Sequence, residues 1–258
     1  MFISDAPAAL RSARGVENLS RIQTHDRSTF EEVRAALAGA PLNEIMPAAP
    51  GDHAAALGFA LAWALMASKD SVIFWSAPEQ DFFEDGLPNA EGLEQFGLPL
   101  DRLIMVRANS QADALWATEQ ALATPEITAL CAISPTKKTL SLTATRRLLL
   151  NAERHKTRCI LLRLDSAGAS AAWSRWRISA APSSGENREL GPPAFAAHLA
   201  RNRAGPSALS FNLQWDIHRH AFQEQQDGDR QTGRGDAVDG AQAATPADGP
   251  AAPHRSAA

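Results

Sequence analysis

Hydrophobic and polar positions alternate in blocks along the middle of this 258-residue chain. Short apolar runs occupy residues 42–45, 72–75, 103–106, 127–133 and 159–164. The intervening segments carry apolar residues at spacings of three and four, the period of a helix face, over residues 54–67, 90–96, 111–123 and 142–154. The first of these helices is apolar nearly all round, so it should be buried. Strands alternating with helices predict βαβ units and a mostly parallel sheet.

The pattern changes to a period of two after Ser170. This period is typical of strands with one buried face, here predicted over residues 173–180, 195–201 and 207–215. A turn at 202–206 separates the last two. We therefore predict an α/β fold with a mostly parallel sheet, flanked by helices and extended by antiparallel strands at its C-terminal end.

Composition divides the chain into an N-terminal helical appendage, a central domain and a tail, with expected bounds at residues 1–40, 41–222 and 223–258. The appendage should hold helices at 8–20 and 29–37, the second capped by Ser28 or Thr29. The tail has Val238 as its only large aliphatic side chain. It cannot offset its ordering entropy, so we expect it to be disordered.

The overall composition excludes a membrane protein. Hydrophobic residues make up 45% and charged residues 21% of the chain, and no apolar run approaches the ~20 residues of a membrane span. The first residues lack the layout of a secretory signal, so a cytoplasmic location is expected. Cys131 and Cys159 lie in apolar runs and are predicted to be buried thiols.

Charge is unevenly distributed, although the formal net charge is only −4. Residues 79–119 carry nine acids against two bases, whereas residues 137–177 carry ten bases against two acids. These are either solvated helix faces or, in the basic half, a surface that meets phosphate or an acidic partner. The candidate contacts lie at the carboxyl end of the sheet, where open α/β sheets meet ligands: Lys137, Lys138, Arg146 and Arg147.

The loop after the first strand stands where a P-loop protein binds phosphate. That motif, G-x-x-x-x-G-K-[ST], needs backbone N–H groups and a Lys around the phosphates and a hydroxyl on magnesium. Here Met46 replaces the first Gly, Gly51 is kept, Asp52 replaces the Lys, and His53 replaces the Ser or Thr. An Asp would repel a phosphate, so no nucleotide cofactor is expected. Asp52 is predicted to cap the following helix instead.

Other catalytic devices are also missing from the sequence. Ser134 follows the fourth strand, where an ATPase needs a magnesium-binding acid, and Glu79 is the only possible water-activating carboxylate after the second strand. Asp216, His218 and His220 could face one side of a strand and bind a metal. A solvated exit from the domain is the simpler interpretation, so neither a metal nor enzymatic activity is predicted.

Several stretches resemble the ImuA family, the RecA-like accessory proteins encoded beside mutagenic polymerase genes in damage-inducible bacterial operons. They span about residues 30–220 in order, at residues 42–45, 47–52, 54–64, 111–116, 142–148, 174–178 and 213–216. The loop of that family is itself degenerate. The resemblance implies a RecA-like core with a degenerate P-loop.

A more distant similarity to RecA itself covers residues 94–103 and 199–206. In the second stretch Arg201 and Arg203 occupy the places of the basic residues that reach the neighbouring nucleotide in RecA filaments. The two DNA-binding loops of RecA would correspond to 135–141 and 165–170, both shorter here. Arg201 and Arg203 therefore join the candidate partner or DNA contacts.

The resemblance implies a non-catalytic accessory protein in SOS-induced error-prone translesion synthesis. Its expected partners are ImuB, a polymerase homologue lacking catalysis, an error-prone C-family DNA polymerase, and RecA. Two alternatives stay open at this point. One is a cell-division inhibitor of the SulA type, and the other is a divergent RecA-like ATPase that uses Arg201 or Arg203 in trans.

Overall fold

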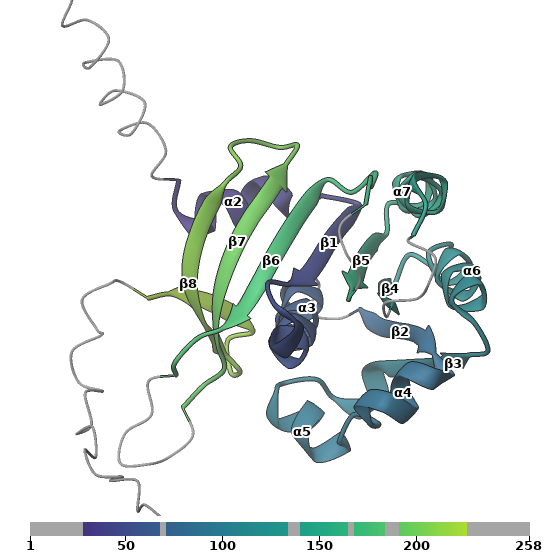
Figure 1. The fold of residues 1–258 in the computed structure, drawn as a ribbon, viewed down its shortest axis with the longest axis horizontal. Coiled ribbons are helices and arrows are strands. Elements are labelled where there is room, and N and C mark those ends of the chain that lie inside the picture. Colours follow the sequence, from purple (N-terminus) through teal and green to yellow (C-terminus); the bar gives the residue numbers. More distant parts are fainter. Residues whose placement is uncertain (1–27, 68–70, 134–139, 165–167, 184–190, 226–258) are drawn as a thin grey trace, which may run out of the picture. The chain divides into compact units, whose positions relative to one another are not determined.

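The computed structural model describes residues 28–67, 71–133, 140–164, 168–183 and 191–225. Within this part of the chain nine strands form one sheet in the order β3-β2-β4-β5-β1-β6-β7-β8-β9 (Figure 1). Their bounds are β1 Leu42–Pro47, β2 Val72–Pro78, β3 Leu103–Ala108, β4 Ile127–Ile133, β5 Arg158–Arg163, β6 Ser174–Ala180, β7 Ala194–Asn202, β8 Leu209–Asp216 and β9 Ala221–Glu224. Strands β1 to β6 pair in parallel, and β7, β8 and β9 are antiparallel.

Helices cover both faces of the parallel part. Their bounds are α2 Phe30–Leu37, α3 His53–Ala67, α4 Glu79–Asp85, α5 Ala90–Gln95, α6 Gln111–Ala121 and α7 Leu142–His155. α2 and α3 share the larger buried cluster with β1, β6 and the antiparallel strands, while α6 and α7 border the smaller cluster on the opposite face. The predicted α/β fold class is confirmed: a mostly parallel sheet is flanked by helices and carries an antiparallel C-terminal extension.

Strand β6 differs from the prediction, because it is parallel to β1 rather than part of the antiparallel extension. Ile45 lies opposite Trp176 in a parallel register, and the antiparallel pairing begins between β6 and β7. A period of two reports that one face of a strand is buried. It does not report the strand's direction, which depends on the path of the chain between β5 and β6.

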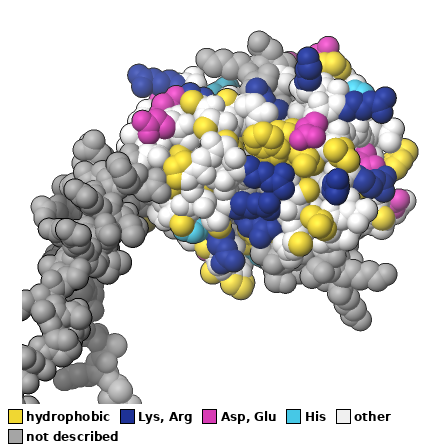
Figure 2. Space-filling view, turned by 90° about the horizontal axis from the view of Figure 1, so that it is seen from above, with side chains coloured by type: hydrophobic (Ala, Val, Ile, Leu, Met, Phe, Trp, Pro, Cys, Tyr) yellow, Lys and Arg dark blue, Asp and Glu magenta, His cyan; other side chains and the backbone are white. Residues whose placement is uncertain are grey.

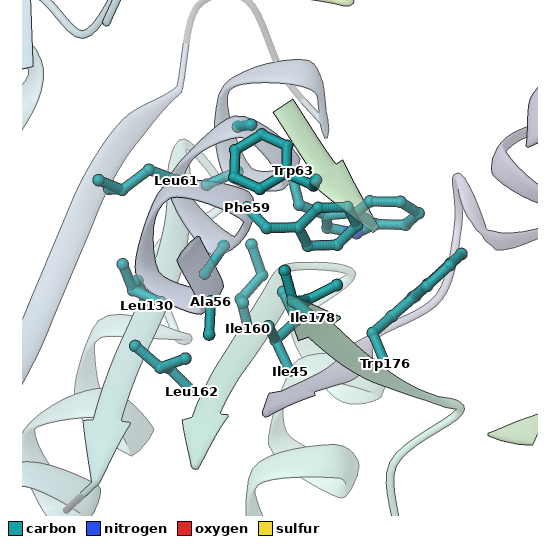
Figure 3. Close-up of a cluster of buried hydrophobic side chains, with 14 of the residues drawn as sticks. Ile45, Ala56, Phe59, Leu61, Trp63, Leu130, Ile160, Leu162, Trp176 and Ile178 are labelled. Atoms are coloured by element: carbon teal, nitrogen blue, oxygen red, sulfur yellow. The ribbon is translucent and has the colours of Figure 1, made fainter. Parts of the chain in front are cut away.

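The larger core is built around α3, as its all-round apolar character predicted. Phe59 and Trp63 stack with ring centroids 5.8 Å apart, and Trp63 lies 5.4 Å from Trp176 of β6. Figure 3 shows these rings above aliphatic side chains from the central strands, among them Ile45 and Ile160. This packing fixes the start of α3, and with it the loop that follows β1.

α2 belongs to this core. Thr29 caps the helix in a capping box with Glu32, which confirms one of the two predicted caps. Phe30 is 2% exposed, and its backbone N–H donates to Glu224 Oε2 of β9 at 3.0 Å. The predicted tail boundary at residue 223 falls within β9, and the compact unit ends at Gln225. The predicted helix at 8–20 and residues 226–258 lie outside the described residues.

The two cysteines are buried, as predicted. Burial raises the pKa of the Cys131 thiol and raises that of Cys159 well above its usual range. Both thiols are therefore held in the protonated form at neutral pH. Among the described helices, none combines the length and the apolar character that crossing a bilayer demands.

Candidate functional site

The loop after β1 leads through a 3-10 turn, Pro50–Asp52, directly into α3. Gly51 is exposed, and Asp52 and His53 are half-buried at the junction. The backbone N–H of Ala48 donates to Ile178 O of β6 at 2.8 Å. The order of strand, loop and helix is thus that of a phosphate-binding loop, but this loop is hydrogen-bonded to the neighbouring strand β6.

The carboxylate of Asp52 accepts one backbone donor of this loop and one of the neighbouring strand β6. Its Oδ2 accepts the N–H of Ala49 at 3.1 Å, and its Oδ1 accepts the N–H of Ala180 at the end of β6 at 3.1 Å. The prediction that Asp52 caps α3 is wrong, because neither bond is to a backbone N–H of that helix. Asp52 reaches back to the residue before the 3-10 turn and sideways to β6, because the turn intervenes between the strand and α3. An anionic side chain thus takes the N–H of Ala49, a loop donor that a bound phosphate would otherwise accept.

Replacing Asp52 by Ala removes both charge-assisted hydrogen bonds and is expected to lower the free energy of unfolding by about 1–2 kcal/mol. ATP binding should still be undetectable, since no Lys or hydroxyl replaces the missing groups. Urea unfolding and isothermal titration measure the two effects. Asp101→Ala, an exposed Asp outside the loop, is the matched control and should change stability by less than about 0.5 kcal/mol. Wild-type stability in the Asp52 variant would contradict this account.

Glu79, the candidate water-activating carboxylate, begins α4 and faces Arg107 of β3. Its Oε1 lies 3.8 Å from the Arg107 Nη1, and both side chains are about half exposed. Such a surface pair contributes little free energy. Ser134 lies outside the described residues. The described part of the chain therefore places Glu79 in a surface ion pair.

A buried ionic cluster crosses the sheet at Glu44, which sequence reasoning did not single out. Glu44 Oε1 accepts from Arg163 Nη1 at 2.8 Å, and both side chains are fully buried. Glu44 Oε2 accepts from Arg175 Nε at 2.5 Å. A Glu inside a buried apolar run was the available signal, since a charge there needs a partner. That partner could not be identified from the sequence.

The same cluster anchors the segment that links β5 to β6. Arg175 Nη2 donates to Gly168 O at 2.9 Å, and Arg201 Nη1 donates to Ser170 O at 2.7 Å. Burial lowers the pKa of Arg201, and the nearby charges of Arg203 and Arg175 lower it further. Arg201 is thus half-buried and engaged within its own chain, whereas Arg203 is exposed. The similarity to RecA had assigned both residues the same outward role.

The remaining candidate cations lie on or near α7. Lys137 and Lys138 fall outside the described residues. Arg146 and Arg147 are exposed, and Arg147 Nη2 donates to Glu119 Oε2 of α6 at 2.5 Å. Two large hydrophobic side chains of the same helix are also exposed, with fractions of 50% for Leu142 and 53% for Leu150. α7 therefore presents a mixed basic and apolar outer face.

The Asp216-x-His218-x-His220 segment forms the turn between β8 and β9, not an exit from the domain. Asp216 Oδ1 accepts the backbone N–H groups of Arg219 and His218, each at 3.0 Å. These bonds, that to Arg219 foremost, lower the pKa of Asp216. His220 stacks on Trp215. In the described part of the chain, no three His, Cys, Asp or Glu side chains are grouped to hold a metal.

No family model matches the chain. The curated relative "Protein ImuA" of Caulobacter vibrioides, in strains NA1000 / CB15N and ATCC 19089 / CB 15, is 34% identical over 180 residues, which is 65% of this chain and 68% of the relative.

Two solved structures are also similar. The RadB recombinase is 16% identical with a TM-score of 0.46, over 69% of this chain and 88% of that one. SulA from Pseudomonas aeruginosa is 21% identical with a TM-score of 0.36, over 48% of this chain and 97% of that one. The identity to the Caulobacter relative and the share of it that is covered establish the family, and this chain belongs to the ImuA family.

Proposed function

We propose that this protein is a non-catalytic accessory factor in SOS-induced, error-prone translesion DNA synthesis. It acts in the cytoplasm with an ImuB-like polymerase homologue and an error-prone C-family DNA polymerase, and RecA is a further partner. It uses no cofactor. Family membership supports the pathway, and the carboxylate of Asp52 in the phosphate loop supports the absence of catalysis.

The loop opposes nucleotide binding by charge and by the loss of donors. A phosphate there would meet the Asp52 carboxylate and compete with it for the N–H of Ala49. Pro47 and Pro50 supply no N–H at all. The P-loop is therefore degenerate in chemistry, and the strand-loop-helix unit serves as a scaffold.

The outer face of α7 is the proposed partner surface, which keeps Arg146 and Arg147 as contacts. Exposed Leu142 and Leu150 add apolar area to these charges, a combination that fits a protein surface better than a phosphate backbone. The segment from Gly168 to Ser170 is bound to the sheet by Arg175 and Arg201, which weighs against a DNA-holding loop there. Lys137, Lys138 and exposed Arg203 complete the candidate contacts.

The proposal is tested by deleting the gene in its host and measuring damage-induced mutation frequency and cell length. Loss of induced mutation with normal cell division is expected, and the wild-type gene should restore it. Loss of damage-induced filamentation, with binding of the purified protein to FtsZ, would indicate the SulA-type alternative. ATP turnover stimulated by DNA would indicate the ATPase alternative. Either result would contradict the proposal.

The α7 surface is tested by Arg146→Glu combined with Leu150→Ser, two exposed changes that should leave the melting temperature nearly unchanged. Association with the purified ImuB-like partner is expected to weaken about tenfold or more, because a charge is reversed and an apolar contact is lost. Arg177→Glu, an exposed reversal on β6, is the matched control and should retain binding. Full binding by the α7 variant would exclude this face.

A further inference from the structure

A hollow opens between α2 and α3 at the amino ends of β1 and β5. Its volume is about 110 Å³, and its apolar lining comes from Leu37, Trp63, Met66 and Ile160. For scale, an engineered apolar cavity of about 150 Å³ holds benzene. The hollow therefore has room for one branched aliphatic side chain.

A second, wider hollow lies between the start of β1, the end of α7 and the residue before β6. Its volume is about 410 Å³, and Pro41, Ala152, Lys156 and Trp173 contribute to its lining. Arg158, the first residue of β5, lines both hollows. The two hollows are therefore neighbours that share Arg158 in their linings.

Arg158 is a half-buried cation for which the described residues supply no acceptor. Desolvation lowers its pKa, and no carboxylate counteracts this effect. The other buried arginines of this protein contrast with it, since Arg163 is paired with Glu44 and Arg201 binds a carbonyl. A partly desolvated guanidinium without an acceptor gains most from an incoming carboxylate, which it binds in bidentate fashion.

The surroundings are basic. The charged residues that line the two hollows are Arg34, Lys156 and Arg158 on the basic side and Glu153 on the acidic side. The amino ends of β1 and β6 point to the top of Figure 1. Figure 2 views the molecule from there and shows basic side chains gathered in the middle of this face beside hydrophobic ones. The charge thus complements an acidic ligand with apolar groups.

We propose that this edge is a docking site for a short extended segment of a partner protein, in which an acidic residue binds Arg158 and aliphatic residues on either side enter the two hollows. Alternate residues of an extended chain point to the same side, about 6.5–7 Å apart. The pattern Leu-x-Asp-x-Leu therefore presents all three groups together. This inference stands whether or not the translesion role is correct, because it rests on the hollows and Arg158 alone.

The probe is a fluorescein-labelled peptide, Gly-Leu-Ser-Asp-Ser-Leu-Gly, titrated into the full-length protein and followed by fluorescence anisotropy. Saturable binding is expected. Arg158→Gln should weaken it about tenfold or more, since a charge-assisted bond is lost. Ala38→Leu, an exposed change that adds volume to the lining of the smaller hollow, should weaken it about fivefold. Arg154→Gln removes a nearby exposed charge outside both hollows and should change binding by less than about twofold.

Three results would overturn the proposal. One is the absence of saturable binding by the wild-type protein. A second is binding of peptides with Asn in place of Asp, or Ala in place of Leu, that equals the binding of the original peptide. This would mean that Arg158 and the hollows do not recognise those side chains. The third is a dimer in sedimentation that Arg158→Gln dissociates, because that would assign the edge to a second copy of this chain. Failure of any of these tests leaves the mutagenesis experiments unaffected.

Discussion

Glu44→Gln is expected to lower the free energy of unfolding by about 3–5 kcal/mol, because it removes the buried carboxylate charge that both Arg163 and Arg175 bind. Arg163 is 0% exposed and cannot turn to solvent, and Arg175 is 17% exposed. Gln keeps the volume of the side chain, so no cavity contributes to the loss. The melting temperature should fall by about 10 °C.

Glu31→Gln is the matched control for this prediction. Glu31 pairs with Arg34 on the surface, is 67% exposed, and should change stability by less than about 1 kcal/mol. Replacing Glu44, Arg163 and Arg175 together by apolar residues of similar size should recover most of the lost stability, since no unpaired charge is then buried. Chemical denaturation measures all three. If Glu44→Gln and Glu31→Gln have equal effects, the buried cluster is not what stabilises this region.

Phe30→Ala is expected to cost about 3–5 kcal/mol, although the residue lies in a short helix near the start of the described chain. Its ring is edge-on to Phe222 and Phe211, with centroid distances of 5.5 and 5.6 Å, and lies 6.3 Å from Trp63. Truncation leaves a cavity among rigid aromatic rings that cannot collapse to fill it. Thermal and urea unfolding measure the loss.

The variant Ala35→Gly distinguishes the intrinsic stability of helix α2 from the stability that its packing contributes. Ala35 is an exposed position of α2, so the Gly variant weakens the helix by about 1 kcal/mol without touching the core. The Phe30 variant should be clearly less stable than the Ala35 variant. Equal losses would show that α2 contributes only its own helical stability, as an appendage would.

Local sequence patterns determined most of the secondary structure. The period of three and four placed α3, α6 and α7, and the apolar runs placed β1 to β5 within three residues at each end. The Thr29 cap and the buried cysteines were also predicted, since each depends on neighbours within a few positions. Helix α4 was missed because its acidic sequence, Glu79–Asp85, shows no apolar period.

From the sequence we predicted that the loop after β1 lacks the groups that bind phosphate. In the structure the carboxylate of Asp52 accepts a backbone N–H of that loop. The sequence shows that Asp52 replaces the phosphate-binding Lys. Only the fold reveals that its carboxylate reaches Ala180, which is 128 residues away in the sequence. Arg201 is the opposite case. The similarity to RecA predicted that it contacts another molecule, whereas in the structure its guanidinium donates to Ser170 O of its own chain.

By itself the sequence determined most of the elements, the replacement of the P-loop Lys and hydroxyl by Asp52 and His53, and the family resemblance, because these depend on residue type and on spacings of a few positions. The tertiary structure decided the direction of β6, the pairing of Glu44 with Arg163 and Arg175, the return of the chain as β9, and the hollows around Arg158. The first two depend on the strand order, which places β1 between β5 and β6. Residues 119 and 131 positions apart become hydrogen-bonded neighbours there, and no local periodicity carries that distance.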